Sequence, residues 1–332
     1  MPTTGVTEDM TSDTSVPVAR VRDLPDLLGV IPHLLGFHPE ESMVLVVQDG
    51  GLIQLTARAD LADLRGPGHL ELLIDRMLLR WPSGAMWLVA YTARERQGWR
   101  LLRRAAAHLG NSLAGEPMCV TGQRYRVATA HGPVYHHDPR AAATAASATL
   151  HGLQARPSRS MLTELVRADP RDLPAAEAAW VRALGKALEL DRGDRPGELL
   201  RSLDRAVHAP DRISRDDLAW LGLLINDAQA RDRAVLSLEQ SAAEAWVEVW
   251  SRVVRSCPPG TQDQPLAVLA LAAWVNGDGA LQSVCLEEMD LLGIAPGLKQ
   301  MLEDLSAAVV PPSDWDELRE RLRAALDDEL AG

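Results

Sequence analysis

The sequence of 332 residues is poor in cysteine and has no long apolar run. Cys119, Cys257 and Cys285 lie far apart and form no Cys-x-x-Cys pair, which indicates reduced, buried thiols. No run approaches the roughly 20 apolar residues that a membrane helix needs. Residues 1–16 have neither the basic start nor the apolar core of a signal peptide. We therefore expect a cytoplasmic protein with no membrane partner.

The motifs of several large enzyme classes are also absent from the sequence. It contains no Gly-x-x-x-x-Gly-Lys-[Ser/Thr], no Gly-x-Gly-x-x-Gly after a strand, no Gly-x-Ser-x-Gly and no His-Glu-x-x-His. P-loop hydrolases, dinucleotide dehydrogenases, serine hydrolases and zincins are therefore disfavoured. We expect no cofactor, and the sequence leaves open whether the protein is an enzyme.

The net charge of −12 is distributed unevenly along the chain. Residues 1–150 hold 14 basic and 15 acidic residues, a net charge of −1, and residues 151–332 hold 20 basic and 31 acidic residues, a net charge of −11. An acidic second half opposes binding to nucleic acid, where affinity comes mainly from phosphate neutralisation, and opposes docking on anionic membranes. Its charge favours a basic protein partner or segment.

The densest structural signal is an apolar stretch near the N-terminus. Helical spacing relates Leu24, Leu27, Leu28, Ile31, Leu34 and Leu35. Pro32 predicts a kink or a split in this helix, and Gly36 suits its left-handed end. Phe37, the only phenylalanine, is expected to anchor the turn to the core. Pro39 is expected to open a single helical turn, and Met43–Val47 to form a fully buried strand.

Residues 32–46 read Pro-His-Leu-Leu-Gly-Phe-His-Pro-Glu-Glu-Ser-Met-Val-Leu-Val. This string resembles the opening motif of an actinobacterial family known only as DUF4192. The likeness runs across the first half of the chain and more loosely into the second half. Many family members carry a cysteine-containing segment where this chain has residues 129–138 without cysteine. Since the family has no established activity, the resemblance implies fold and lineage and no mechanism.

Strand and helix patterns alternate in the first half and give way to helices in the second. Strands are expected at 43–47, 52–58, 86–91, 117–120 and 125–130, and helices at 70–78, 99–109 and 139–150. This order predicts an α/β domain with a mixed sheet and packed helices. We expect a disordered tail over 1–18, the α/β domain over 19–152, and an all-α domain of TPR-like helical hairpins over 158–330.

Local signals support the helical prediction for the second half. Ser214, Asp278 and Ser313 are placed to cap helix starts. The tryptophans fall mostly on apolar stripes and are expected in the core rather than in a ligand cage: Trp180, Trp220, Trp246, Trp250, Trp274 and Trp315.

The first candidate site is a histidine-rich segment after the last predicted strand. His131, His136, His137 and Asp138 could bind a metal or transfer protons. Their spacing matches no established metal motif, and neighbouring His136 and His137 are expected to point apart. The alternative is a polar loop in which Asp138 caps the following helix.

The second candidate site lies in the turn before the first strand. A histidine and a carboxylate there could act as acid and base, with His33, His38, Glu40, Glu41 and Ser42 as the polar residues. The alternative is structural, because the glutamates favour a helical turn and the serine can bond its backbone. If a site exists, these residues and the histidine segment are expected to meet at one sheet edge.

A third cluster is basic and lies on the helix predicted over 99–109 and just before it. It consists of Arg94, Arg96, Arg100, Arg103 and Arg104. It could hold a phosphate or an acidic partner, with the acidic second half as an internal candidate. The alternative is the solvated face of an amphipathic helix.

The leading hypothesis is a cytoplasmic interaction or scaffold protein. Its acidic helical half would offer a groove to a protein partner, as helical-repeat surfaces commonly do. The alternative is an enzyme, or a small-ligand-binding or metal-binding protein, with its site at the edge of the N-terminal sheet. Nucleic-acid binding is disfavoured by the charge. The sequence leaves the oligomeric state and the biological process open.

Overall fold

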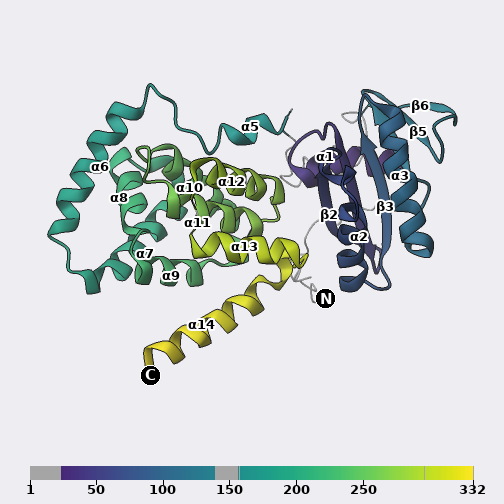
Figure 1. The fold of residues 1–332 in the computed structure, drawn as a ribbon. Helices are drawn as coiled ribbons and strands as arrows, with labels where there is room; N and C mark the ends of the chain where they lie inside the picture. The colour runs from purple at the N-terminus through teal and green to yellow at the C-terminus, as the bar shows by residue number, and fades with distance from the viewer. Residues whose placement is uncertain (1–23, 139–155, 157, 295, 332) are drawn as a thin grey trace, which may run out of the picture.

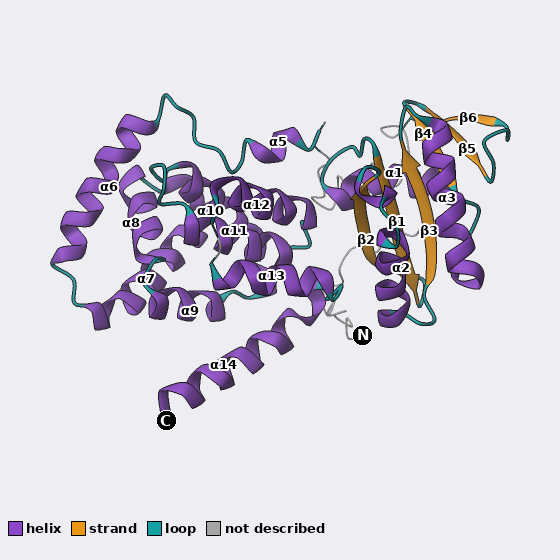
Figure 2. Ribbon diagram, in the orientation of Figure 1, coloured by secondary structure: helices purple, strands orange, loops and turns teal. Residues whose placement is uncertain are grey.

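The computed structural model describes residues 24–138, 156, 158–294 and 296–331 (Figures 1 and 2). The tail expected over 1–18 and the helix expected over 139–150 lie outside these residues. A six-stranded sheet with its helices lies at one end of the molecule and a body of helices at the other. The prediction of an α/β half followed by an all-α half is therefore confirmed. The domain limits at 152 and 158 stay predictions.

The sheet has the strand order β2-β1-β3-β4-β5-β6. Its strands are β1 (Ser42–Asp49), β2 (Leu52–Asp60), β3 (Ala85–Tyr91), β4 (Met118–Thr121), β5 (Arg124–Val127) and β6 (Val134–His136). The β3–β4 pair is parallel and the other neighbouring pairs are antiparallel. We did not predict β6, because its three residues are all exposed and give no alternating apolar pattern.

The central strand β1 is buried on both faces, as its continuous apolar run predicted. Val44 and Val46 face α1 (Leu24–Leu35), and Met43, Leu45 and Val47 face the other way. That second face is covered by α2 (His69–Arg80) and α3 (Glu95–Leu109) (Figure 2). Both helices start and end within a few residues of their predicted limits.

The second half is helical throughout its described residues. Its helices are α5 (Ser160–Thr163), α6 (Leu173–Leu188), α7 (Arg195–His208), α8 (Arg215–Leu224), α9 (Ala228–Ser237), α10 (Ala243–Arg255), α11 (Asp263–Val275), α12 (Gly279–Leu292), α13 (Gly297–Ala307) and α14 (Trp315–Ala331). All six tryptophans of this half are buried, as predicted. Every residue of α11 from Pro265 to Val275 is buried, so this helix is the centre of the helical body.

Two of the three predicted helix caps are present. Ser214 and Asp217 form a reciprocal capping box at the start of α8. Asp278 accepts a hydrogen bond from the Leu281 amide at 2.9 Å and so caps α12. The prediction for Ser313 is wrong: this serine lies inside the short 3-10 helix η6 (Pro312–Asp314), and its hydroxyl bonds the Asp314 carboxylate.

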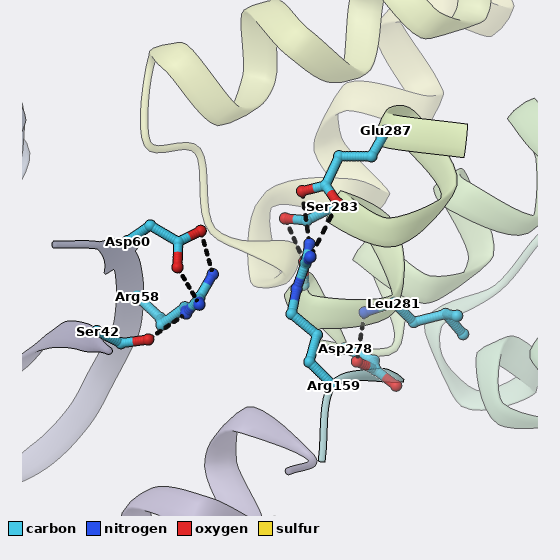
Figure 3. A network of polar contacts seen from close by, with 9 residues as sticks. Ser42, Arg58, Asp60, Arg159, Asp278, Leu281, Ser283 and Glu287 are labelled. Carbon is cyan, nitrogen blue, oxygen red and sulfur yellow. Dashed lines mark hydrogen bonds and ion pairs between the residues drawn. The ribbon is translucent and has the colours of Figure 1, made fainter. Parts of the chain in front are cut away.

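The two halves join at the turn after α1. Phe37 is 2% exposed, and it belongs to one apolar cluster that continues into the helical half. Arg156 forms a parallel bridge with Phe37, in which the His38 amide donates to the Arg156 carbonyl at 3.1 Å. Figure 3 shows polar clusters of both halves near this junction, including Arg58 with Asp60 and Arg159 with Glu287. The anchoring role predicted for Phe37 is confirmed.

The turn itself differs from the prediction in one respect. Residues 38–40 form no helical turn, so that expectation for Pro39 was wrong. Gly36 has the predicted left-handed backbone, with φ of +73°. Glu41 is also left-handed, with φ of +44°, which is rare for a residue with a side chain. The helical turn is replaced by a tight, strained entry into β1.

Candidate functional site

A pocket of about 360 Å³ lies at one edge of the sheet. It opens where β3 and β4 end and β1 begins, at the carboxyl ends of the parallel strand pair. Ligands of open α/β sheets commonly bind at such a position. The polar side chains that line it are His38, Glu40, Glu41, Tyr91, Thr92 and His137. Both sequence candidates, the turn and the histidine segment, contribute to this one pocket.

His137 is the buried histidine of the pocket, at 8% exposure. Its backbone amide donates to the Gln123 carbonyl at 2.8 Å, which continues the β5–β6 pairing by one residue. Its ring packs edge-on against Tyr125, with the ring centroids 6.4 Å apart. Burial lowers the pKa of His137, and the neighbouring His38 lowers it further. The neutral imidazole is therefore favoured in the pocket.

The hydrogen-bond partner of the His137 ring is a backbone carbonyl of α1 that lacks its usual donor within the helix. The reason is a proline four residues further along α1. In an α-helix, the carbonyl of Leu28 would accept from the amide of residue 32, and Pro32 has no amide hydrogen. The freed carbonyl of Leu28 bonds His137 instead, which opposes the lowering of that pKa. Helix α1 continues through Pro32 unbroken. Of the kink or split that Pro32 predicts, the split is absent, and the imidazole of His137 is a partner for the carbonyl that the proline leaves free.

Glu41 connects two strand ends in the lining of the pocket. Its carboxylate accepts from the Thr92 hydroxyl at 2.9 Å and from the Ala93 amide at 3.1 Å. The Glu41 carbonyl accepts from the Leu61 amide at 3.0 Å. These contacts hold its left-handed backbone, which costs on the order of 1–3 kcal/mol and is found mainly where surrounding structure enforces it. Glu41 thus ties the start of β1 to the end of β3.

Tyr91, the last residue of β3, supplies an unsatisfied polar group. Its hydroxyl is buried and has no hydrogen-bond partner among the described residues. Burial raises the pKa of Tyr91 well above its usual value, so the phenol stays protonated. A buried hydroxyl without a partner costs about 1–3 kcal/mol. Such a group calls for an explanation, and a ligand in the pocket supplies one.

The remaining residues of the turn have different positions. His38 is half-buried in the lining and Glu40 is exposed at its mouth. Ser42 is fully buried and lies outside the lining. Its hydroxyl donates to the Glu40 carbonyl at 2.5 Å and accepts from Arg58 Nε at 2.8 Å. Ser42 therefore makes the local backbone hydrogen bond of the structural alternative, without the helical turn, and the catalytic roles considered for His38, Glu40 and Ser42 stay predictions.

The histidine segment is divided by strand alternation. His136 points outward and is exposed, whereas His137 points inward, as predicted. His131 and Asp138 are exposed and outside the lining. Within the described residues, no group of three or more His, Cys, Asp or Glu side chains is arranged to hold a metal ion. The structure therefore does not bring His131, His136 and His137 together, and the cap expected from Asp138 would act outside the described residues.

The basic cluster of α3 belongs to the sheet half. Arg104 donates to Glu71 of α2 at 2.5 Å, and this bond holds the pKa of the Glu71 carboxyl below its usual range. Arg94, Arg96, Arg100 and Arg103 are exposed. Arg104 forms its ion pair within the sheet half and not with the acidic half. The alternative of a solvated amphipathic face accounts for the four exposed arginines.

The cysteines and the helices carry no further signal for a site. Burial raises the pKa of Cys119 and Cys257 to about 12, so neither thiol is reactive near neutral pH. Across the described part of the chain, no helix is both long enough and apolar enough to span a bilayer.

Sequence reasoning identified His38, Glu40, Glu41 and His137 but missed two other residues of the pocket. Tyr91 was predicted only as the end of a buried strand, and Thr92 was given no role. The available signal was their position, since polar residues at the carboxyl end of a strand that precedes a helix commonly face a ligand.

Comparison with known proteins places the chain in a lineage and assigns no activity. No curated protein and no solved structure matches it. One family model matches, over residues 25–313, and so covers the sheet, the pocket and most of the helical half. The chain therefore belongs to the family described as domain of unknown function DUF4192.

Proposed function

We propose that the pocket at the sheet edge binds a small molecule that carries a protonated amine on an apolar body. The charge of the lining is the observation that supports this proposal most. Glu40 and Glu41 line the pocket, and no lysine or arginine does so among the described residues. An ammonium group makes its strongest hydrogen bonds with carboxylates. A volume of about 360 Å³ suits a compact ligand.

The rest of the lining fits the body of such a ligand. Leu28, Pro32 and Val120 supply apolar surface. The unpaired hydroxyl of Tyr91 can accept from or donate to a polar group of the ligand. A ligand that reaches this hydroxyl would remove the cost of leaving it unpaired. The pocket therefore combines one charged contact, one neutral hydrogen bond and an apolar wall.

The proposal is tested by screening the full-length protein against small amines and shape-matched carboxylic acids, with calorimetry on the amines that raise its melting temperature. We expect amines to bind, and Glu40→Gln to weaken their binding about tenfold, roughly 1.4 kcal/mol. Tyr91→Phe should weaken only ligands with a second polar group. Glu116→Gln, an exposed change in the same half outside the pocket, is the control. Acids that bind instead, or equal effects of Glu40→Gln and Glu116→Gln, would contradict the proposal.

Acid–base catalysis at the same pocket stays a prediction. A neutral imidazole at His137 and a carboxylate at Glu40 are groups that general acid–base chemistry uses. Turnover of a bound amine, lost in His137→Gln while binding is retained, is the result that would add an enzymatic role.

A second proposal concerns the helical half, which we infer to be a cytoplasmic protein-interaction surface with TPR-like hairpins. The outermost helix, α6, supports it (Figure 1). Val181, Leu184 and Leu188 follow helical spacing on α6 and are 67%, 45% and 90% exposed. The outer face of a terminal helix in a repeat array is normally polar. An apolar stripe there is better explained by a partner than by solvent.

The interaction role is tested by capture of a partner with full-length protein. We expect capture to be lost in Leu184→Glu combined with Leu188→Glu and kept in Leu79→Glu, a change at an 85% exposed leucine of α2. Capture that survives the double change would contradict a role for α6.

A further inference from the structure

A groove of about 880 Å³ runs across the helical half. It is lined by residues of α5 and the segment after it, of the start of α6, of the start of α8 and of the last turn of α10. Figure 1 shows where these helices lie in the helical half. These elements are far apart in the sequence, so the groove is created by helix packing alone. It lies in the other half of the molecule from the sheet-edge pocket and shares no lining residue with it.

The charge of the groove is opposite to that of the surrounding half. Four arginines line it, namely Arg167, Arg215, Arg252 and Arg255, against the three acidic residues Glu164, Asp169 and Asp172. The lining thus carries a net charge of +1, while residues 151–332 as a whole carry −11. Arginine is gathered here from three separate elements.

The four arginines differ in the hydrogen bonds and ion pairs that they already make with the protein. Arg252 donates to the carbonyls of Pro210 and Ile213 and so holds the connection between α7 and α8. Arg255 is exposed, and it has no carboxylate within 4 Å among the described residues; its one hydrogen bond there runs from Nε to the Ser251 carbonyl at 3.3 Å. Of the four arginines, Arg255 therefore has the most N–H donors available to a ligand.

One further arginine holds an exposed ion pair that a ligand could replace. Arg215 bonds Asp172 at 2.6 Å, and both side chains are about half exposed. Exposed pairs of this kind contribute little to folding. A carboxylate that arrives from outside can therefore compete for the Arg215 guanidinium without disturbing the helices. Arg167 bonds Glu288 of α12 at 2.9 Å, and because the Glu288 side chain is only 13% exposed, this pair is structural and stays in place.

The groove also has an apolar component. Ile213 and Leu218 line it together with Ala168 and Ala176. A free phosphate needs no such surface, and a nucleic acid would have to cross the acidic remainder of this half. A peptide that alternates carboxylates with apolar side chains uses both parts of the lining.

We propose that this groove docks an acidic, partly apolar peptide segment of a partner protein, with Arg255 and Arg215 as its carboxylate contacts. The inference rests on the proposed interaction role of the helical half and specifies the partner. The net charge of this half favoured a basic partner. We now expect an acidic one, because the segment would contact the lining of the groove and not the whole surface of this half.

The test is a peptide-display selection on the full-length protein at low ionic strength. We expect selected peptides to be enriched in Asp and Glu beside Leu, Ile or Phe. Arg215→Glu combined with Arg255→Glu should weaken the best synthetic peptide at least about tenfold, since like charges then face each other. Arg233→Glu, an exposed change on α9 outside the lining, should leave its affinity unchanged. Circular dichroism of each variant shows whether the fold is kept.

Other outcomes overturn the proposal. Selection of Lys-rich or Arg-rich peptides would support an interaction role with the opposite chemistry and reject the acidic segment. Acidic peptides that bind the double variant as well as the parent protein would place their site elsewhere. No enrichment at all would reject the groove proposal, and the capture test on α6 would then decide the interaction role separately. Displacement of the peptide by inorganic phosphate or a short RNA at equal concentration would make the groove a general anion site.

Discussion

The sheet-edge pocket and the helical groove each differ in charge from the half that contains them. The sheet half is nearly neutral, yet its pocket is lined by two carboxylates and no lysine or arginine among the described residues. The helical half carries −11, yet its groove is lined by four arginines. Each cavity would select a ligand that the net charge of its half does not suggest.

The difference shows that concave surfaces follow local charge. Screening in 0.1–0.15 M salt limits the reach of an exposed charge to about 8–10 Å. A ligand inside a groove therefore responds to the side chains of the lining and only weakly to acids elsewhere on the same half. The acids of the helical half lie largely on exposed helix faces, such as Asp204 and Glu317.

The largest predicted effect tests whether the two halves are energetically independent. Phe37 belongs to an apolar cluster that both halves share. We expect Phe37→Ala to lower the free energy of unfolding by about 3–5 kcal/mol, because it empties a fully packed site. Urea unfolding followed by tryptophan fluorescence measures this. Leu79→Ala, an 85% exposed control, should change it by less than about 0.5 kcal/mol. A loss under about 1 kcal/mol for Phe37→Ala would mean that the halves are independent.

The next effect concerns His137, which has no counterpart in the groove. His137→Leu should lower the free energy of unfolding by about 1–3 kcal/mol, because leucine has no donor and the Leu28 carbonyl loses its partner. Adding Pro32→Ala should recover much of this loss, since residue 32 then has an amide hydrogen for that carbonyl. Chemical denaturation of both variants measures the recovery. A double variant no more stable than His137→Leu alone would refute this account of α1.

The same residue makes stability depend on pH. Because burial lowers the pKa of His137, the unfolded chain binds the proton more readily than the folded one below about pH 6.5. The stability that the neutral ring provides is present above that pH and is lost as the pH falls toward the lowered pKa. We expect His137→Gln to flatten this part of the stability curve and His136→Gln, at the exposed neighbour, to leave it intact. Equal slopes in the two variants would contradict the assignment.

A cross-test sharpens the contrast between the cavities. Glu40→Gln should weaken an amine ligand about tenfold and leave an acidic peptide unaffected, and Arg255→Gln should do the reverse. Calorimetric titration of both ligands against both variants measures the four affinities. Coupled losses would show that the two cavities communicate.

The smallest effect distinguishes binding from folding in the groove. Arg215→Gln breaks an exposed ion pair with Asp172 and should change the free energy of unfolding by less than about 1 kcal/mol. Urea titration measures the change. A larger loss of unfolding free energy would mean that Arg215 stabilises the helix packing and is not available to a ligand.

The sequence by itself determined the secondary structure and the lineage. The β-branched run of β1, the 3.6-residue periodicity of α2, α3 and α10 and the glycine after α1 follow from local stereochemistry, which acts within a few residues. The opening motif was enough to indicate the family. Local rules failed at β6, where three exposed residues form a strand because β5 lies beside them.

Only the tertiary structure decided what the cavities contain. Pro32 predicts a kink or a split because it has no amide hydrogen, and the carbonyl that it leaves free has a partner in His137, more than 100 residues away. Arg167, Arg215 and Arg255 are ordinary surface residues in sequence and neighbours in one groove. Periodicity reports which face of an element is buried, but it carries no information about which residues of distant elements meet. The packing of helices and strands brings those residues together and so determines the chemistry of both sites.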